Sequence, residues 1–146
     1  MQVLTWNCAG NTPTPTFDIS HILHQEGDSS PPEVYVVGLQ EMVKLNAKSV
    51  IQGKDKERVL LWEQIVTRSI SKDCRYVCIG RKPMVGCFIM LFARDEHKHK
   101  VNNIRTSKVK TGFGGQSGNK GSVAIRFNYA NTSFAFINCH LTSGQS

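Results

Sequence analysis

Acidic residues are missing from the whole second part of the sequence. All 11 Asp and Glu residues of the 146-residue chain lie within residues 1–96, where 11 Lys and Arg residues balance them. Residues 97–146 contain 7 Lys and Arg residues and no carboxylate, so they carry the entire formal net charge of +7. Such a basic surface suits an anionic partner, which is a phosphorylated ligand, an acidic membrane or a nucleic acid. The alternative interpretation is a basic solvated face that serves only solubility.

Three other features are absent. There is no run of 18 apolar residues, so we expect no membrane-spanning helix. The N-terminal MQVLTWNCAG has neither the basic region nor the apolar region of a secretory signal. The five cysteines are odd in number and include no CxxC pair, which favours free thiols in a reducing cytosol over disulfides or a zinc site. We therefore expect a cytoplasmic protein.

Hydrophobic residues make up 40% of the chain, enough for the core of one domain or of part of one. Helical periodicity predicts a short helix over 17–24 and a longer one from Asp55 through Ile70. Apolar runs and alternation predict strands over residues 3–7, 33–39, 75–80, 84–94, 100–110, 122–127 and 133–140. The strands 75–80 and 84–94 are expected to meet at a turn over residues 81–83, and 122–127 and 133–140 at one over 128–132. This order predicts a mixed α/β fold with a buried sheet.

Polar side chains follow three of the predicted strands where each strand ends. Asn7 ends the first, Gln40 and Glu41 follow 33–39, and Asn138 and His140 end the last. Any one of them alone is more often an ordinary turn or strand-end residue. Together they predict a site at one edge of the sheet. Mg²⁺ takes oxygen ligands, and one or two carboxylates suffice when a substrate phosphate supplies another, so Glu41 with Asn7 beside it suits this ion.

The glycine-rich segment 111–121 (TGFGGQSGNKG) matches neither common nucleotide motif. It departs from the P-loop because Asn119 and Gly121 replace required residues and a strand follows it instead of a helix. Ser117 interrupts the dinucleotide pattern G-x-G-x-x-G. The segment can still bring backbone N–H groups, Asn119 and Lys120 close to an anion. A plain hairpin loop is an equally good interpretation of these residues alone.

Four segments together resemble a known family. TWNCAGN (5–11), GLQEMVKLN (38–46), GFGGQSGNKGSVAIRF (112–127) and INCHLTSGQ (137–145) look like successive motifs of the inositol polyphosphate 5-phosphatases. That family belongs to the endonuclease/exonuclease/phosphatase superfamily. The motifs occur in the family's order and span nearly the whole chain. The combination of GLQEMVKLN, SGNKGSVAIRF and CHLTSG points to the phosphatase branch over the nucleases.

The resemblance implies an α/β fold of two stacked mixed β-sheets flanked by helices. It implies a phosphoric monoester hydrolase that uses Mg²⁺ to remove the 5-phosphate from phosphoinositides or soluble inositol polyphosphates. The expected partners are this substrate and, transiently, an anionic membrane surface, with no nucleic acid.

Site residues are carried over by motif position. Glu41 matches the metal ligand, and Asn7 matches a residue beside the metal that also belongs to the catalytic group. His140 matches the residue that contacts the scissile phosphate and stabilises its developing charge. Asn119 and Lys120 match positions at or near the substrate phosphates.

The family's later motifs do not occur in this sequence. These are an Asp-x-Asn motif whose Asp polarises the attacking water, a Trp-Cys-Asp-Arg motif for ring phosphates, and a late Asp-His pair. Residues 97–146 hold no acid that could replace them, and the segment His140-Leu141-Thr142-Ser143-Gly144 follows directly on the last core strand. We therefore expect residues 1–146 to be the N-terminal portion of a single truncated catalytic domain, inactive alone. A non-catalytic phosphoinositide-binding fragment and a nuclease of the same superfamily are the alternatives.

Overall fold

The structure is a computed structural model that describes residues 1–23, 30–43, 55–112 and 117–141. Parts of the predicted helix 17–24, of the glycine-rich segment and of the motifs at 38–46 and 137–145 lie outside these ranges. The elements, in chain order, are β1 (Gln2–Asn7), α1 (Ser20–Leu23), β2 (Val34–Gln40), α2 (Asp55–Ile70), β3 (Tyr76–Met84), β4 (Cys87–Arg94), the 3-10 helix η1 (Asp95–Lys100), β5 (Val101–Gly112), β6 (Ser117–Tyr129) and β7 (Thr132–His140).

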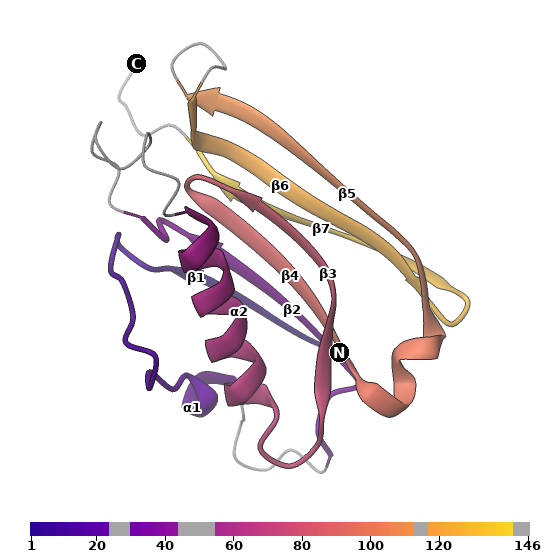
Figure 1. The fold of residues 1–146 in the computed structure, drawn as a ribbon. Coiled ribbons are helices and arrows are strands. Elements are labelled where there is room, and N and C mark those ends of the chain that lie inside the picture. The colour runs from indigo at the N-terminus through magenta and orange to yellow at the C-terminus, as the bar shows by residue number, and fades with distance from the viewer. Residues whose placement is uncertain (24–29, 44–54, 113–116, 142–146) are drawn as a thin grey trace.

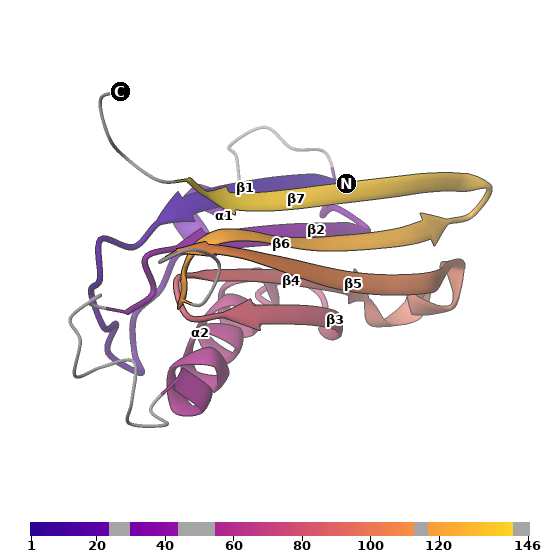
Figure 2. The same ribbon diagram turned by 90° about the horizontal axis from the view of Figure 1, so that it is seen from above.

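The strands form two sheets. The first sheet has the order β1-β2-β4-β3, in which β1 and β2 are parallel and the other neighbours are antiparallel. The second sheet, β5-β6-β7, is antiparallel. Helices α1 and α2 cover one face of the first sheet and the second sheet covers the other (Figures 1 and 2). The predicted fold of two stacked sheets with helices is confirmed, with the mixed pairing confined to the first sheet.

Strand β2 lies between β1 and β4 and is buried on both faces, as its continuous apolar run predicts. Alternate β2 side chains enter two separate cores. Tyr35, Val37 and Leu39 pack with the apolar face of α2. Val34 and Val36 pack instead against residues of the second sheet. The first sheet is therefore held from both sides, and its strand ends are fixed in position.

The turn between β3 and β4 differs from the prediction at residues 81–83. Strand β3 continues to Met84, which pairs with Cys87, so Val85 and Gly86 form the turn. Pro83 was expected to break the strand, but it pairs opposite Phe88 inside β3. Because β3 is an edge strand, a residue without an N–H group is tolerated there.

The glycine-rich segment also differs from the predicted loop. Strand β5 extends to Gly112 and β6 begins at Ser117, so Asn119 and Lys120 lie on a strand. The register shifts between Lys110 and Gly112, which marks a bulge. Gly121 has φ 138°, and a Cβ there would lie 2.0 Å from the Val109 carbonyl oxygen. The predicted loop at 128–132 is likewise shorter, because β6 and β7 are joined by a turn over residues 130–131.

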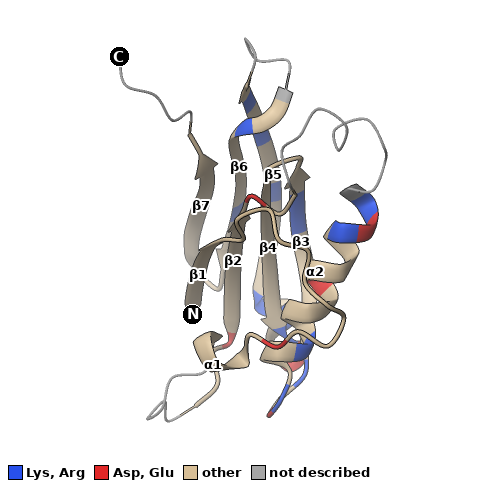
Figure 3. Ribbon diagram, turned by 90° about the vertical axis from the view of Figure 1, so that its left-hand side faces the viewer, with Lys and Arg blue, Asp and Glu red and all other residues tan. Residues whose placement is uncertain are grey.

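Charge is distributed unevenly over the layers. The second sheet carries Lys and Arg and no acidic residue (Figure 3). None of the helices in the described ranges is both long and apolar enough to cross a membrane.

At the other end of β2, Glu33 joins several elements. Its carboxylate accepts a hydrogen bond from the Tyr129 hydroxyl of β6 and lies 3.3 Å from Lys100 Nζ and 3.2 Å from His97 Nε2 of η1. The hydrogen bond from Tyr129 is the main cause that lowers the pKa of Glu33 from its ordinary value of 4.5. The carboxylate therefore favours the folded state only when it is ionised.

We expect Glu33→Gln to destabilise the chain near neutral pH. A depressed folded-state pKa contributes stability that is present above the unfolded pKa and is lost as pH falls through the folded value. The stability difference between the wild type and Glu33→Gln should thus shrink as pH falls below about 4.5. Urea denaturation between about pH 6 and about pH 3 measures it. Glu57→Gln, an exposed change on α2, is the control, and a pH-independent difference for Glu33→Gln would contradict the assignment.

Candidate active site

The parallel pairing of β1 and β2 brings the first two site residues to one edge of the sheet. Asn7 is paired with Gln40, and Glu41 follows directly. Strand β7 of the second sheet ends at His140, which is paired with Gly121 of β6. The ends of β1, β2 and β7 meet at the same end of the two-sheet stack (Figure 1).

Glu41 is the centre of the cluster. Its Oε1 atom accepts a hydrogen bond from Asn7 Nδ2 at 3.0 Å and lies 3.2 Å from His140 Nε2. The Glu41 side chain is 35% exposed, whereas that of His140 is 9% exposed. The structure therefore brings together the three strand-end residues that the sequence singles out, with the carboxylate open to solvent and the imidazole behind it.

His140 has a defined arrangement of its two ring nitrogens. Nδ1 lies 3.0 Å from the Asn119 carbonyl oxygen, which can only accept, so Nδ1 carries a proton. Nε2 lies 2.8 Å from Lys120 Nζ. In the neutral ring Nε2 accepts from the ammonium, and in the protonated ring it donates to Glu41. Asn119 and Lys120, predicted from the glycine-rich segment, thus belong to the same cluster.

The backbone holds Glu41 in an uncommon conformation. Its φ is 49°, in the left-handed region that non-glycine residues rarely adopt. Two backbone hydrogen bonds fix it there, from Glu41 N–H to the Gly86 carbonyl at 2.8 Å and from Gly10 N–H to the Glu41 carbonyl at 2.7 Å. Strain that the surroundings maintain in this way clusters at functional sites.

The electrostatics keep Glu41 ionised. The hydrogen bond from Asn7 is the largest cause that lowers the pKa of this carboxyl, and the charges of His140 and Lys120 act in the same direction. Asn7 also accepts a hydrogen bond from Ala9 N–H at 2.8 Å through its Oδ1 atom. Its amide group is therefore turned with the NH₂ towards the carboxylate. A carbonyl oxygen has a second lone pair, so Oδ1 retains capacity for one more contact.

The donor set fits a hard cation with few protein ligands. Glu41 supplies an ionised carboxylate at the surface and Asn7 an amide oxygen beside it, and Mg²⁺ or Ca²⁺ prefers such oxygen ligands. Burial, with a smaller contribution from the Glu41 charge, raises the pKa of the nearby Cys8 thiol to about 12, so the thiol is protonated at neutral pH. Within the described ranges there is no group of three or more His, Cys, Asp or Glu residues that could hold a metal by themselves.

Asn138 is the site-related residue to which sequence reasoning assigned no role. It is buried between the sheets, and its Nδ2 donates to the carbonyls of Leu39 at 2.8 Å and Phe88 at 3.0 Å. Its Oδ1 accepts from Gln40 Nε2, which also donates to Thr5 Oγ1 at 2.9 Å. One amide thus connects β7 to β2 and β4. It lies two residues before His140, and its partner Gln40 directly precedes Glu41. The sequence pattern could have indicated this role. Positions 134, 136 and 138 share one face of β7, so Asn138 is a polar residue on the same face as Phe134 and Phe136.

Gly38 makes room for this amide. A Cβ at Gly38 would lie 3.0 Å from Asn138 Cγ and 3.2 Å from Oδ1. The glycine in the middle of β2, otherwise unfavourable in a strand, is thus explained by the close approach of a side chain from the other sheet.

Residues 4–146 match the model of the Endonuclease/Exonuclease/phosphatase family 2. The chain belongs to this family. Its relatives include human synaptojanin-2, 37% identical over 128 residues. They also include the polyphosphatidylinositol phosphatase INP53 of Saccharomyces cerevisiae, 35% identical over 135 residues, and the inositol-1,4,5-trisphosphate 5-phosphatase 1 of Schizosaccharomyces pombe, 39% identical over 116 residues. The resemblance inferred from the four motifs is confirmed.

These matches cover most of this chain but a small part of each relative. They cover 88%, 92% and 77% of the chain and 8%, 12% and 11% of the three relatives, respectively. The chain therefore spans about a tenth of the length of these relatives.

Solved structures agree with the fold. The inositol polyphosphate 5-phosphatase domain of a synaptojanin, in complex with inositol (1,4)-bisphosphate and calcium, is 29% identical with a TM-score of 0.72. That match covers 97% of this chain and 40% of the solved one. A Cimex nitrophorin is only 12% identical with a TM-score of 0.67, over 96% of this chain and 45% of its own. The nitrophorin shares the fold alone.

We expect Asn138→Ala to destabilise the chain by about 1–3 kcal/mol, because the carbonyls of Leu39 and Phe88 remain buried without this donor. Urea denaturation at neutral pH measures the loss. The control is Asn128→Ala, which removes the Oδ1 that accepts a hydrogen bond from the Ser133 hydroxyl near the far end of the second sheet. Equal, small effects of the two substitutions would show that the amide does not link the sheets.

Proposed function

We propose that this chain is the N-terminal portion of a single catalytic domain that removes the 5-phosphate from phosphoinositides or soluble inositol polyphosphates with the help of Mg²⁺. The observation that carries the proposal is the contact of Glu41 with Asn7 and His140 at one end of the two sheets. The names of the relatives support it. One acts on inositol 1,4,5-trisphosphate, and a solved one holds inositol (1,4)-bisphosphate, which is what remains when that compound loses its 5-phosphate.

Glu41 is the metal ligand in this proposal, with Asn7 holding its carboxylate in position and offering the amide oxygen. A divalent cation there supplies Lewis-acid stabilisation of phosphoryl oxygens. The solved relative binds calcium, which supports a divalent cation. Mg²⁺ is our choice, because it binds well through one or two carboxylates together with substrate phosphates.

His140 and Lys120 act on the phosphate. Phosphoryl transfer requires mainly positioning and positive charge directed at the oxygens of the transferred group. The ammonium of Lys120 and the Nε2 face of His140 lie together, 2.8 Å apart, so both can turn towards one phosphate. Asn119 fixes the imidazole through its carbonyl and lies beside Lys120 for contact with the substrate.

The rest of the domain is proposed to pack against the second sheet. The outer face of that sheet exposes large apolar side chains, among them Val109 at 58% and Ile137 at 67% exposure. The solved relative is a longer chain, of which this one covers 40%. The activating acid and the residues that choose among ring phosphates are proposed to lie in that remaining part.

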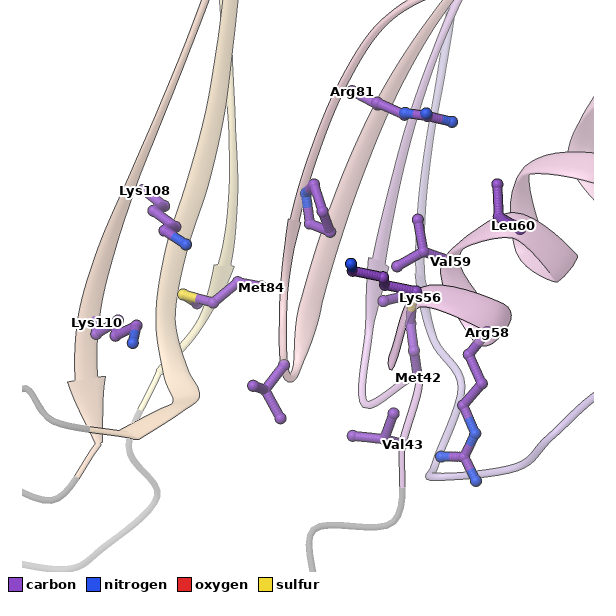
Figure 4. A pocket seen from close by; sticks show the side chains of 12 residues that line it. Met42, Val43, Lys56, Arg58, Val59, Leu60, Arg81, Met84, Lys108 and Lys110 are labelled. Carbon is purple, nitrogen blue, oxygen red and sulfur yellow. The ribbon is translucent and has the colours of Figure 1, made fainter. Parts of the chain in front are cut away.

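A cavity beside the site supports contact with an anionic membrane. It has a volume of about 530 Å³, and Met42 and Val43, the two residues that follow Glu41, line it (Figure 4). Its lining includes Lys56, Arg58, Arg81, Lys108 and Lys110. Lysines 108 and 110 approach from β5, across the cavity from α2 (Figure 4). Arg81 is already paired with Glu63, and each of the other cations near an anionic leaflet contributes about 1 kcal/mol, so this basic rim favours a cytoplasmic enzyme that binds membranes transiently.

We expect Glu41→Gln to lower Mg²⁺-dependent phosphate release by at least about a hundredfold in the complete catalytic domain, because the neutral amide loses the charge that attracts the cation. The assay follows phosphate released from inositol 1,4,5-trisphosphate. Glu57→Gln on α2 is the matched control and should leave turnover unchanged. An unimpaired Glu41→Gln enzyme would contradict the assigned role.

The 146-residue chain alone is expected to release little phosphate in the same assay. Measurable Mg²⁺-dependent turnover by the chain would contradict this expectation. Head-group binding that is indifferent to Mg²⁺ would favour a non-catalytic binding fragment. Binding of nucleic acid with a steep salt dependence would favour a nuclease.

A further inference from the structure

The turn between β3 and β4 contacts the site through Gly86. The Gly86 carbonyl accepts the N–H of Glu41 at 2.8 Å, and the Gly86 N–H donates to the Gly118 carbonyl at 3.2 Å. Gly86 therefore joins Glu41 to the start of β6, which is the strand that carries Asn119 and Lys120. The two halves of the site come from different sheets, and this peptide lies between them.

The space at Gly86 admits no side chain. A Cβ there would lie 2.6 Å from the Asn119 carbonyl oxygen and 3.3 Å from His140 Nδ1. A separation of 2.6 Å is closer than two such atoms approach without displacement, and the atom to be displaced belongs to the backbone. It is the same oxygen that accepts the Nδ1–H of His140 at 3.0 Å.

The turn itself does not account for the glycine. Among the described glycines, only Gly10 and Gly121 have φ in the left-handed region that favours this residue. The φ of Gly86 lies outside that region, so its φ alone does not call for a glycine. What the position requires is the absence of a Cβ next to the Asn119 carbonyl.

We propose that Gly86 is a positioning residue that fixes the tautomer and orientation of His140. By leaving room for the Asn119 carbonyl, it lets that oxygen hold the proton on Nδ1, so that Nε2 faces Lys120 and Glu41. The catalytic use of this arrangement rests on the function proposed above, whereas the arrangement itself does not. The Gly86 carbonyl also holds the Glu41 backbone, whereas the missing Cβ of Gly86 acts on the Asn119 carbonyl and, through it, on His140.

The first measurement needs no variant. In the 146-residue chain labelled with ¹⁵N in its histidines, long-range ¹H–¹⁵N spectra above the range in which histidine protonates report which ring nitrogen of His140 carries the proton. We expect the Nδ1–H form, with exchange of that proton slowed by roughly tenfold relative to an exposed ring. An Nε2–H form in the folded wild-type chain overturns the proposal.

The second measurement compares Gly86→Ala with Gly118→Ala. The control Cβ at position 118 would meet the side chains of Met84 at 3.1 Å and Val85 at 3.3 Å, which can move. Circular dichroism first establishes that both variants are folded. We expect Gly86→Ala to shift His140 towards the Nε2–H form and Gly118→Ala to leave it unchanged. Retention of the wild-type tautomer in folded Gly86→Ala overturns the proposal, and the wild-type measurement decides it if this variant does not fold.

Turnover separates this inference from the proposed function. In the complete domain we expect Gly86→Ala to lower kcat by roughly tenfold to a hundredfold with little change in KM, because the misdirected imidazole no longer stabilises the charge that develops in the transition state. A shifted tautomer with full kcat would support the positioning by Gly86 and contradict the catalytic role of His140. An unshifted tautomer with a lowered kcat would overturn the inference and leave the proposed function standing.

Discussion

The buried amide of Asn138 is the interaction on which the geometry of the site depends. The two sheets pack through apolar side chains, and the hydrophobic effect itself has no preferred direction. Asn138 supplies direction, since its NH₂ group bonds two backbone carbonyls of the first sheet from a strand of the second. Its oxygen accepts from Gln40, the residue before Glu41. The distance between Glu41 and His140 follows from this link, because each lies within two or three residues of it.

Around this link, the site is built from backbone more than from side chains. Glu41 is held by hydrogen bonds to Gly10 and Gly86, and the ring of His140 by the carbonyl of Asn119. Backbone groups of packed strands have little freedom, so they orient a partner without a further loss of side-chain entropy. Asn7 is the exception, and its own oxygen is fixed by the N–H of Ala9. The described cluster therefore contains few groups that must be ordered when a ligand binds.

The sequence predicts the parts of this arrangement that depend on local patterns. The buried strand β2, the helix α2 and the polar residues at strand ends follow from periodicity and from the rule that sheet proteins place sites at strand ends. The turn at Val85 and Gly86 was missed because Pro83 signals a break, and only the edge position of β3, a property of the assembled sheet, permits it to remain in the strand. Gly86 has no local signature either, since its requirement is set by a carbonyl more than thirty residues away.

The charge balance of the cluster bears on how a cation and a phosphate would affect each other's binding. Glu41 is its only carboxylate among the described contacts, and His140 and Lys120 already interact with it. A divalent cation would meet one negative charge and a nearby ammonium, which is a weak site by the standard of oxygen-ligated metals. A phosphate would meet the ammonium and the imidazole but also the carboxylate. Each ligand relieves the repulsion that the other experiences, because their charges are opposite and lie side by side. Under the function proposed above, the cation and the phosphate are therefore expected to bind together, each raising the affinity for the other.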